Sequence, residues 1–267
     1  QRASNSSPRR RKKPLLSLVK IGRETLAKTA ALRSDDNIPS ITGRKIRYDS
    51  LKRFEPLTES QEQVFLEFNK NRNLVLSGFP GTGKTFLASF LAMKEILLRE
   101  SNYEKLVIVR STVPVRDIGF MPGTKEEKES VYELPYKAIF DEIFYPVTNG
   151  SIIEKLREQK LYEFISTSFI RGLTIKNAIV IVDEFENLSL HELDSIITRL
   201  GSNCKIVFCG DVKQSDLTKK SELDGVVKFI NILDNMQKFS HIEFCEDDIV
   251  RSDLVKSYII AKHKLGL

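Results

Sequence analysis

Runs of apolar residues alternate with amphipathic stretches along most of this chain. Four short runs rich in Val, Ile and Leu have the composition of strands covered on both faces, and they lie at residues 74–77, 105–109, 178–182 and 204–209. Between these runs, apolar positions recur with the helical period at residues 86–98, 189–200 and 222–234. Strands that alternate with helices in this way predict an α/β fold, with a parallel sheet and helices on both of its faces.

The first 53 residues differ from the rest in charge. They carry 15 Lys and Arg against 4 Asp and Glu, a net charge of +11, whereas the remaining residues carry 27 against 32, a net charge of −5. We expect residues 1–14 to be disordered, residues 15–33 to form a short helix and residues 35–40 to be a linker. The chain therefore divides into a basic, partly disordered N-terminal arm and linker at residues 1–53 and a main domain at residues 54–267.

The most basic part of the arm is the run Arg9, Arg10, Arg11, Lys12 and Lys13. A run of this kind binds nucleic acid through its phosphates, with an affinity that falls as the salt concentration rises. Two other interpretations stay open. The arm has the composition of a solvated disordered tail, and its abundance of Arg and Ser with few acids is also typical of an organelle-targeting segment.

The overall composition, with 41% hydrophobic and 29% charged residues, is that of a soluble globular protein. No apolar run approaches the roughly 18 residues that a membrane span needs, so we expect no membrane partner. The three cysteines, Cys204, Cys209 and Cys245, lack the paired spacing of metal ligands. We expect them to be free thiols in a reducing compartment rather than a disulfide framework.

A phosphate-loop motif follows the first strand-like run. The segment Gly78-Phe79-Pro80-Gly81-Thr82-Gly83-Lys84-Thr85 fits the pattern G-x-x-x-x-G-K-[ST] at every fixed position, between an apolar run and a helical pattern. In such loops backbone N–H groups surround phosphate oxygens; here Lys84 would reach the β- and γ-phosphates and the Thr85 hydroxyl would bind Mg²⁺. The alternative, a glycine turn before an ordinary helix, does not account for the full pattern. The sequence therefore predicts a nucleoside triphosphate site and the fold of a P-loop NTPase.

Two acidic residues, Asp183 and Glu184, end the run at 178–182. We assign Asp183 to the metal and Glu184 to the general base that activates water for attack on the γ-phosphate. Two solvated acids at the end of a strand are the alternative. In this kind of fold another strand separates the phosphate-loop strand from the strand that ends in Asp-Glu, and we expect the run Leu106–Val109 to fill that gap.

A third candidate group follows the run at 205–209, in the segment Gly210–Gln214. A polar residue at this strand tip would contact the γ-phosphate or the attacking water and report hydrolysis to the rest of the protein. Gln214 is our first choice for this role and Asp211 the second. Ordinary turn chemistry after a strand is the alternative, because Gly-Asp is common in turns.

Further blocks accompany these motifs in a fixed order. They are Pro56–Gln61, Val109–Arg110, Gly119–Gly123 followed by Glu127 and Lys128, Phe169–Thr174, Asp183–Asn187, Gly210–Leu217 and Asp248–Arg251. With these blocks, from about Pro56 to Ala261, the chain resembles the PhoH-like ATPases, which are related to the first ATPase domain of superfamily 1 helicases. It departs from the family pattern at Phe185, where the family has a small residue, and at Glu186, where the family has a glutamine that is a candidate for coupling ATP to nucleic acid.

The resemblance implies a RecA-like P-loop domain that binds ATP and Mg²⁺. It implies that Gln61 reads the adenine edge and that Arg110 and Arg171 either face nucleic acid or brace the active site. It also implies that Arg251 neutralises charge at the γ-phosphate as an arginine finger does, beside Lys84, Glu184 and Gln214. A structural ion pair is the alternative role for each of the three arginines.

The resemblance also bears on partners and on location. Superfamily 1 helicases close ATP between two ATPase domains, whereas only one fits here. Either the protein merely binds ATP, or a neighbouring subunit completes each site. For the second case we expect a homo-oligomeric ring, with a hexamer favoured by the family, in which Arg251 or another arginine reaches the ATP of the next subunit. The family also favours the cytoplasm of a bacterial or phage-infected cell.

Two functions stay open. The first is an ATPase that couples hydrolysis to RNA or single-stranded DNA in a helicase-like way. Glu186, which stands where the family has a glutamine, puts ordinary helicase coupling in doubt. The second is a nucleotide-gated assembly protein with little strand separation. The Asp-Glu pair disfavours a small-molecule kinase because it suits the activation of water, and the chain has no Asn-Lys-x-Asp motif to read guanine.

An aromatic stripe, Tyr132, Tyr136, Phe140 and Phe144, recurs every four residues. If exposed, such side chains would stack on nucleic-acid bases. The segment is also rich in acids, which would repel phosphates. We therefore expect these aromatic residues to lie in the core.

Overall fold

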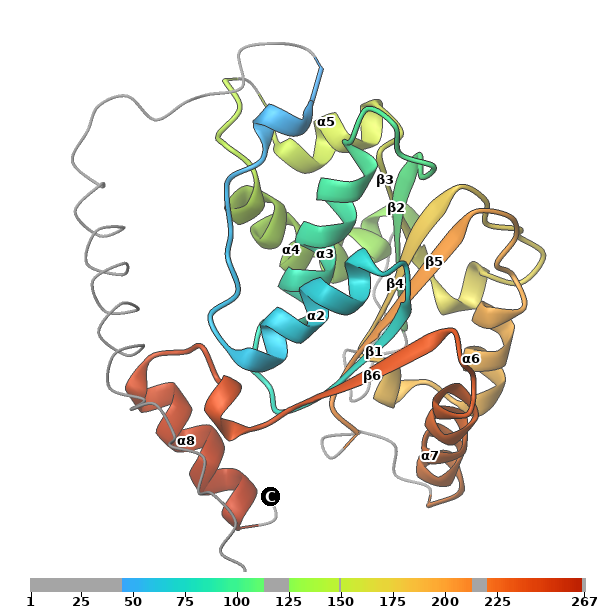
Figure 1. Cartoon of the computed structure of the whole chain (residues 1–267). Coiled ribbons are helices and arrows are strands. Elements are labelled where there is room, and N and C mark those ends of the chain that lie inside the picture. The colour runs from blue at the N-terminus through green and yellow to red at the C-terminus, as the bar shows by residue number, and fades with distance from the viewer. Residues whose placement is uncertain (1–44, 113–124, 149, 213–219, 266–267) are drawn as a thin grey trace, which may run out of the picture. The chain divides into compact units, whose positions relative to one another are not determined.

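The central feature of the fold is a six-stranded sheet in which every pairing is parallel (Figure 1). The structure is a computed structural model that describes residues 45–112, 125–148, 150–212 and 220–265. The basic run at 9–13, the expected helix at 15–33 and Gln214 lie outside the described residues. The strands are β1 Asn73–Gly78, β2 Lys105–Arg110, β3 Tyr162–Ser166, β4 Ala178–Asp183, β5 Cys204–Cys209 and β6 Phe239–Phe244. The helices are α2 Glu59–Asn69, α3 Lys84–Ile96, α4 Lys125–Ile143, α5 Ile152–Glu158, α6 Leu190–Ile197, α7 Lys220–Asp234 and α8 Asp253–Lys264, and the short 3₁₀ turns are η2 Tyr48–Ser50, η3 Thr167–Phe169, η4 Phe185–Asn187 and η6 Glu246–Asp248.

The strand order is β3-β2-β4-β5-β1-β6, which corrects one expectation. The strand between the phosphate-loop strand β1 and the Asp-Glu strand β4 is β5, with Val75 beside Phe208 and Asp183 beside Cys209. The run Leu106–Val109, which we expected in that gap, belongs to β2 on the far side of β4. The chain leaves β1 through α3 and skips two places in the sheet, which β4 and β5 later fill. Order along the sequence does not reveal such a skip.

Helices cover both faces of the sheet, as the alternation of elements predicts. Leu74 and Leu76 of β1 belong to a buried cluster with α2, α3, α4 and α5, whereas Val75 between them belongs to a cluster with α6 and α7. The fold class is therefore confirmed, and the four expected strands are present. Strands β3 and β6 were not predicted; β6 pairs with β1 alone, and its alternating burial lacks the continuous apolar run of an inner strand.

The segment that precedes α2 is part of the core. Ile46 and Leu51 are buried, the backbone N–H of Lys52 donates to the carbonyl oxygen of Ile143 at 2.9 Å, and that of Tyr145 donates to the carbonyl oxygen of Ser50 at 3.0 Å. Packing therefore begins earlier than residue 54, where the charge distribution places the start of the domain. Segment 46–52 holds the end of α4 in place.

Three of the four residues of the aromatic stripe, in and just after α4, lie in the core, and Tyr132 is partly buried. Tyr136, Phe140 and Phe144 are fully buried, and the Phe140 ring packs edge-on against Tyr162 with centroids 5.0 Å apart. This confirms the core interpretation for these three residues. The helix continues through Pro135, which lies inside α4.

A line of side chains joins β1, β6 and α7. The Ser77 hydroxyl lies 2.7 Å from His241 Nε2, and His241 Nδ1 lies 3.1 Å from an Asp234 carboxylate oxygen. The order Ser-His-Asp is that of a serine hydrolase. However, Ser77 is only 6% exposed, and its strand pairs with β6 at this point. We therefore conclude that these three side chains help to hold the edge strand β6 against β1 and α7.

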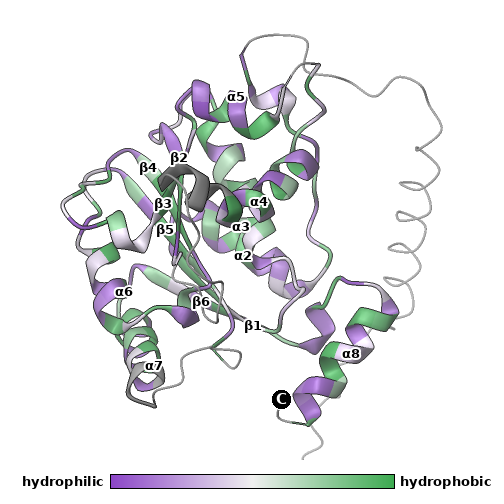
Figure 2. Cartoon of the chain, turned by 180° about the vertical axis from the view of Figure 1, so that it is seen from behind, coloured by the Kyte–Doolittle hydropathy of each residue, from purple (hydrophilic) through white to green (hydrophobic). Residues whose placement is uncertain are grey.

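Helix α8 has no buried residue and carries both hydrophobic and hydrophilic side chains (Figure 2). One side lies near the phosphate loop, because the His263 ring is 4.5 Å from the Phe79 ring. Leu254 and Tyr258 are 81% and 68% exposed. An exposed apolar surface of this kind is typical of contact with another protein.

The remaining general expectations concern cysteines and membranes. Cys209 is buried, Cys204 is partly buried, Cys245 is exposed, and all three are free thiols. Within the part of the chain that the structure describes, no helix is both long and apolar enough to span a bilayer.

Candidate nucleotide-binding site

A pocket of about 690 Å³ opens where β1, β4 and β5 end. The carboxyl ends of parallel strands meet at the same edge of the sheet, which is where α/β folds bind ligands. The pocket is lined by the phosphate loop, by Asp183 and Glu184 after β4, and by Gly210 and Asp211 after β5. The structure thus brings together groups that are far apart in the sequence.

The phosphate loop depends on its glycines at two points. Gly78 has φ of +106°, and a Cβ atom there would lie 2.2 Å from the carbonyl oxygen of Phe244, so no other residue fits. Gly83 has φ of +84° and is the N-cap of α3. The Thr82 hydroxyl donates to the Phe79 carbonyl oxygen at 2.9 Å, which closes the loop. The first turn of α3 therefore faces the pocket with its backbone N–H groups, an arrangement that binds phosphate.

The Lys84 side chain is held inside the phosphate loop. It is 9% exposed, and its ammonium donates to the carbonyl oxygens of Gly78 at 2.7 Å and Phe79 at 2.6 Å. Burial lowers the pKa of Lys84, and the nearby Asp211 carboxylate acts in the opposite direction. The lysine is thus a buried cation bonded to neutral oxygens, which suits it to a phosphate ligand.

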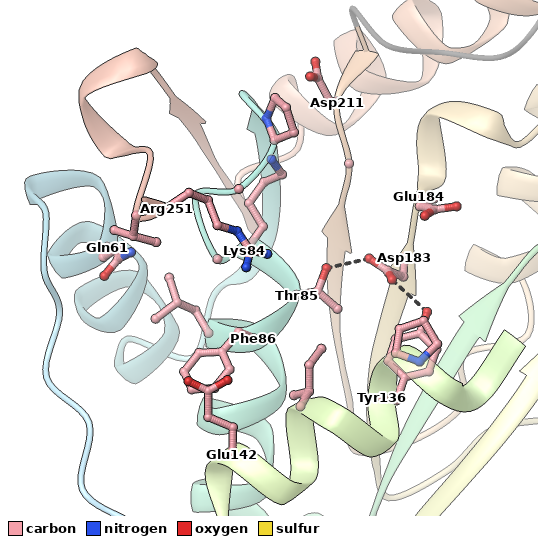
Figure 3. Close-up of a pocket in the computed structure, with 18 of the residues that line it drawn as sticks. Gln61, Lys84, Thr85, Phe86, Tyr136, Glu142, Asp183, Glu184, Asp211 and Arg251 are labelled. Carbon is pink, nitrogen blue, oxygen red and sulfur yellow. Dashed lines mark hydrogen bonds between the residues drawn. The ribbon is translucent and has the colours of Figure 1, made fainter. Parts of the chain in front are cut away.

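The residues expected to hold a metal are in contact. The Thr85 hydroxyl donates to Asp183 Oδ1 at 2.7 Å, and the Tyr136 hydroxyl donates to Asp183 Oδ2 at 2.7 Å (Figure 3). No group of three or more His, Cys, Asp or Glu among the described residues could hold a metal. Mg²⁺ does not need one, because it binds through one or two protein oxygens together with phosphates and water. The hydroxyl and carboxylate oxygens here therefore fit Mg²⁺.

Glu184 has an unusual backbone and a charged partner. Its φ of +50° and ψ of +44° are left-handed, which is uncommon for a residue with a side chain and is often found at functional sites. Its Oε1 lies 2.5 Å from Nη2 of Arg110, the last residue of β2, and the Glu184 side chain is 45% exposed. The structure thus places Arg110 in the pocket, paired with the expected base.

Glu186, which replaces the family's glutamine, is turned toward the tip of β5. It is 6% exposed, and a Cβ atom on Gly210 would lie 1.9 Å from Glu186 Oε2. Burial raises the pKa of Glu186 to about 7, while hydrogen bonds from its own backbone and that of Asp211 oppose the shift. Near pH 7 part of the Glu186 population is therefore protonated and uncharged, like the glutamine that the family has at this position.

Gln61 contacts the phosphate loop directly. It is 3% exposed; its Nε2 donates to the Thr82 carbonyl oxygen at 3.1 Å, and its Oε1 accepts from the Leu57 backbone N–H at 2.8 Å. An amide has a second N–H and a second lone pair, so these bonds leave Gln61 one donor and one acceptor. Gln61 lines the pocket together with Phe54 and Phe86, whose rings pack edge-on against each other with centroids 5.0 Å apart.

Arg251 lies at the phosphate loop of its own chain. The backbone N–H of the preceding residue, Val250, donates to the Gly81 carbonyl oxygen at 3.1 Å, and a Cβ atom on Gly81 would lie 2.9 Å from Arg251 Cγ. Figure 3 shows Gln61 and Arg251 on one side of Lys84, and Asp183 and Glu184 on the other. Arg251 therefore approaches the loop from the side opposite to the expected base.

Comparison with known proteins agrees with this site. The profile of the family described as PhoH-like protein matches residues 53–262, most of the chain. The chain belongs to the PhoH-like family. The matched region includes the whole phosphate loop.

Relatives and one solved structure show the extent of this similarity. A PhoH-like protein of Bacillus subtilis is 32% identical over 209 residues, which are 78% of this chain and 63% of the relative. A PhoH-like protein of Mycobacterium leprae is 30% identical over 223 residues, 81% of this chain and 62% of the relative. The large terminase of a thermophilic bacteriophage, solved in complex with ADP, is 13% identical with a TM-score of 0.46, over 76% of this chain and 49% of its own. This chain thus spans less than two thirds of the length of these PhoH-like relatives.

Most of the predicted site residues that the structure describes meet in the pocket of this PhoH-like chain. The residues that lie in or around it are Gln61, residues 78–85 of the loop, Arg110, Asp183, Glu184, Asp211 and Arg251. Arg171 is exposed and does not line the pocket. The departure Phe185 is fully buried and packs against Phe208, with ring centroids 5.8 Å apart, so a large residue here serves the core.

The sequence did not reveal every residue of the pocket. Phe54 and Phe86 line it, and neither was singled out although Phe86 directly follows the loop motif. Tyr136 was expected to be in the core, and it is, but its hydroxyl also reaches Asp183. Nothing in the spacing of Tyr136 and Asp183, 47 positions apart, indicates this contact.

The raised pKa of Glu186 predicts a pH-dependent stability. A carboxyl whose pKa is about 7 when folded, above its ordinary 4.5, contributes stability below pH 4.5 that is lost as pH rises through 7. Glu186→Gln should therefore raise Tm at pH 8 by about 5 °C or more, and at pH 5 by only about a quarter as much, because pH 5 is just above the ordinary pKa of 4.5. Thermal unfolding without nucleotide or metal measures this. The control Glu100→Gln removes an exposed glutamate. Equal shifts at both pH values for Glu186→Gln would contradict the pKa assignment.

Proposed function

We propose that this PhoH-like chain is a Mg²⁺-dependent ATPase that couples hydrolysis to the binding or remodelling of RNA or single-stranded DNA, within a homo-oligomeric ring. The observation that carries the proposal is the meeting of Lys84, the Thr85–Asp183 pair and Glu184 in one pocket. The bacterial relatives favour a cytoplasmic location.

The chemistry follows from the positions of these groups. Bound Mg²⁺ would supply positive charge to the β- and γ-phosphates, with Thr85 and Asp183 holding it. Lys84 exchanges the carbonyl oxygens of Gly78 and Phe79 for phosphate oxygens, and the N–H groups of the loop bind the same phosphates. Glu184 accepts the proton of the water that attacks the γ-phosphate. Because Arg110 occupies Glu184 Oε1, the pair must loosen or share this oxygen when water is activated.

ATP is the favoured nucleotide because of Gln61. Its remaining donor and acceptor match the adenine edge, which presents one acceptor and one donor. The contact of Arg251 with the loop of its own chain supports a role at the nucleotide that the same subunit binds. Whether Arg251 or another arginine also reaches the ATP of the next subunit stays a prediction.

Nucleic-acid coupling is supported by the basic arm and is tested by ATP turnover. We expect RNA or single-stranded DNA to stimulate phosphate release at low salt. Deletion of residues 1–13 should weaken nucleic-acid binding and reduce the slope of log affinity against log salt by up to about 4, because six cations, Arg2 and the run at 9–13, are removed at roughly 0.7 each. Deletion of residues 1–7, which leaves the run at 9–13 intact, is the matched control. Turnover that nucleic acid does not change would favour the alternative, a nucleotide-gated assembly protein.

Ring formation is supported by α8, whose exposed Leu254 and Tyr258 lie on a helix next to the nucleotide pocket. Light scattering after size exclusion, with and without ATP and Mg²⁺, measures the mass of the assembly. We expect a mass several times that of one chain of 30.5 kDa, with a hexamer favoured. A strict monomer under both conditions would rule the ring out.

A further inference from the structure

Both oxygens of the Asp183 carboxylate are held by hydroxyl groups. Thr85 donates to Oδ1 and Tyr136 donates to Oδ2, each at 2.7 Å (Figure 3). Thr85 belongs to the phosphate loop, whereas Tyr136 comes from α4, an element outside the motifs of the pocket. Tyr136 is fully buried, and Phe140 one turn later is buried too, so the helix fixes the position of the phenol.

The directions of the hydrogen bonds around Tyr136 follow from chemistry. The Tyr136 hydroxyl donates its hydrogen to Asp183 Oδ2 at 2.7 Å. Arg110 also hydrogen-bonds to this phenol. A guanidinium can only donate, so the phenol oxygen accepts from Arg110 and its single hydrogen goes to Asp183.

Arg110 extends the chain of contacts to the expected base. Its Nη2 lies 2.5 Å from Glu184 Oε1. The phenol therefore connects two functional carboxylates, Asp183 directly and Glu184 through Arg110. With Oδ2 occupied by the phenol, Oδ1 is the oxygen that faces Thr85.

We propose that Tyr136 is a positioning residue of the metal site. Its hydroxyl fixes the orientation of the Asp183 carboxylate, so that Oδ1 and the Thr85 oxygen are presented together to Mg²⁺, and it ties this carboxylate to the Arg110–Glu184 pair. Partners of this kind behind a metal ligand commonly contribute about 10- to 100-fold to metal affinity. This inference rests on the proposed Mg²⁺-dependent nucleotide binding.

The test is Tyr136→Phe, which removes one oxygen and keeps the ring that fills the core. The measurement is the fluorescence of a labelled ADP, titrated onto the full chain in EDTA and at a series of Mg²⁺ concentrations. We expect the Mg²⁺ concentration that half-maximally tightens ADP binding to rise about 10-fold, because the Asp183 carboxylate loses its fixed orientation. Affinity in EDTA should stay within about twofold, since Tyr136 acts on the metal rather than on the nucleotide.

Tyr162→Phe is the matched control. Tyr162 is also buried, and its hydroxyl donates to the carboxylate of Glu133 at 3.1 Å, away from the pocket. We expect this control to lower Tm without changing the Mg²⁺ requirement. An equal rise in the Mg²⁺ requirement for both variants would overturn the inference, because it would show a general loosening of the core.

Combining Tyr136→Phe with Asp183→Asn shows whether Tyr136 acts on Mg²⁺ binding through Asp183 or in another way. If Tyr136 acts through Asp183, Tyr136→Phe should add less than about twofold to the defect of Asp183→Asn. A wild-type Mg²⁺ requirement in folded Tyr136→Phe, or full additivity with Asp183→Asn, would overturn the inference. These results differ from a failure of the proposed function, in which the wild-type chain itself would not bind ADP more tightly with Mg²⁺.

Discussion

Glu184→Gln should bind Mg²⁺-ATP with nearly wild-type affinity and hydrolyse it about 10²- to 10⁴-fold more slowly, the usual contribution of a general base. Glutamine keeps the size of the side chain and its ability to contact Arg110, but an amide does not accept a proton from water. Glu184 is also left-handed at the tip of β4, so its side chain is aimed by the backbone. Single-turnover phosphate release, combined with a separate measurement of ATP binding, tests this expectation.

Glu163→Gln is the matched control for that variant. Glu163 has a side chain 44% exposed and an ion pair with Lys105 at 2.6 Å, so it resembles Glu184 in exposure and in charge pairing. It lies on β3 outside the pocket, and we expect wild-type turnover. Turnover by Glu184→Gln within about threefold of wild type would remove Glu184 as the base and leave its ion pair as its role.

Lys84→Ala should weaken ATP binding by about 30-fold or more, because the buried cation that meets the phosphates is lost and such pairs contribute about 2 kcal/mol or more. Lys84 is enclosed by the loop and already donates to two carbonyl oxygens, so it needs little reorganisation to bind a phosphate. Calorimetric or fluorescence titration of ATP in the presence of Mg²⁺ measures the affinity.

Lys205→Ala separates this effect from the general cost of removing a buried lysine. Lys205 is 3% exposed, donates to the Phe68 carbonyl oxygen at 2.9 Å and has a pKa lowered to about 8 by burial, yet it lies outside the pocket. We expect a lower Tm and unchanged ATP affinity. If Lys84→Ala binds ATP as tightly as Lys205→Ala does, the loop does not hold the triphosphate in the manner we propose.

Several features of the site could be predicted because their signal is local. The phosphate loop is eight consecutive residues whose glycines are required by nearby backbone, such as the contact between Gly78 and Phe244. Asp183 and Glu184 were found because a fully apolar run ends at them, which marks the tip of an inner strand. Gln61 followed from the family resemblance, and the structure gives it a further contact with Thr82.

Other features depend on how distant segments pack. The place of β5 between β1 and β4 was predicted wrongly, since apolar runs reveal strands but not their order in the sheet. Strand β6 was missed because it pairs on one side only and keeps polar residues between buried ones. The positions of Arg251 beside Gly81 and of Glu186 beside Gly210 are contacts between segments that are remote in sequence.

The amino-acid sequence by itself determined that this chain has an α/β fold, a phosphate loop, an acidic strand tip and membership of a family. Each of these is recognised from neighbouring residues or from the order of short sequence blocks. Only the tertiary structure decided which strand tips adjoin, that Tyr136 and Thr85 hold the two oxygens of Asp183, and that Arg110 pairs with Glu184. These contacts arise from the sheet order and from the docking of α4. Both are set by packing between elements, which the pattern within a single element does not record.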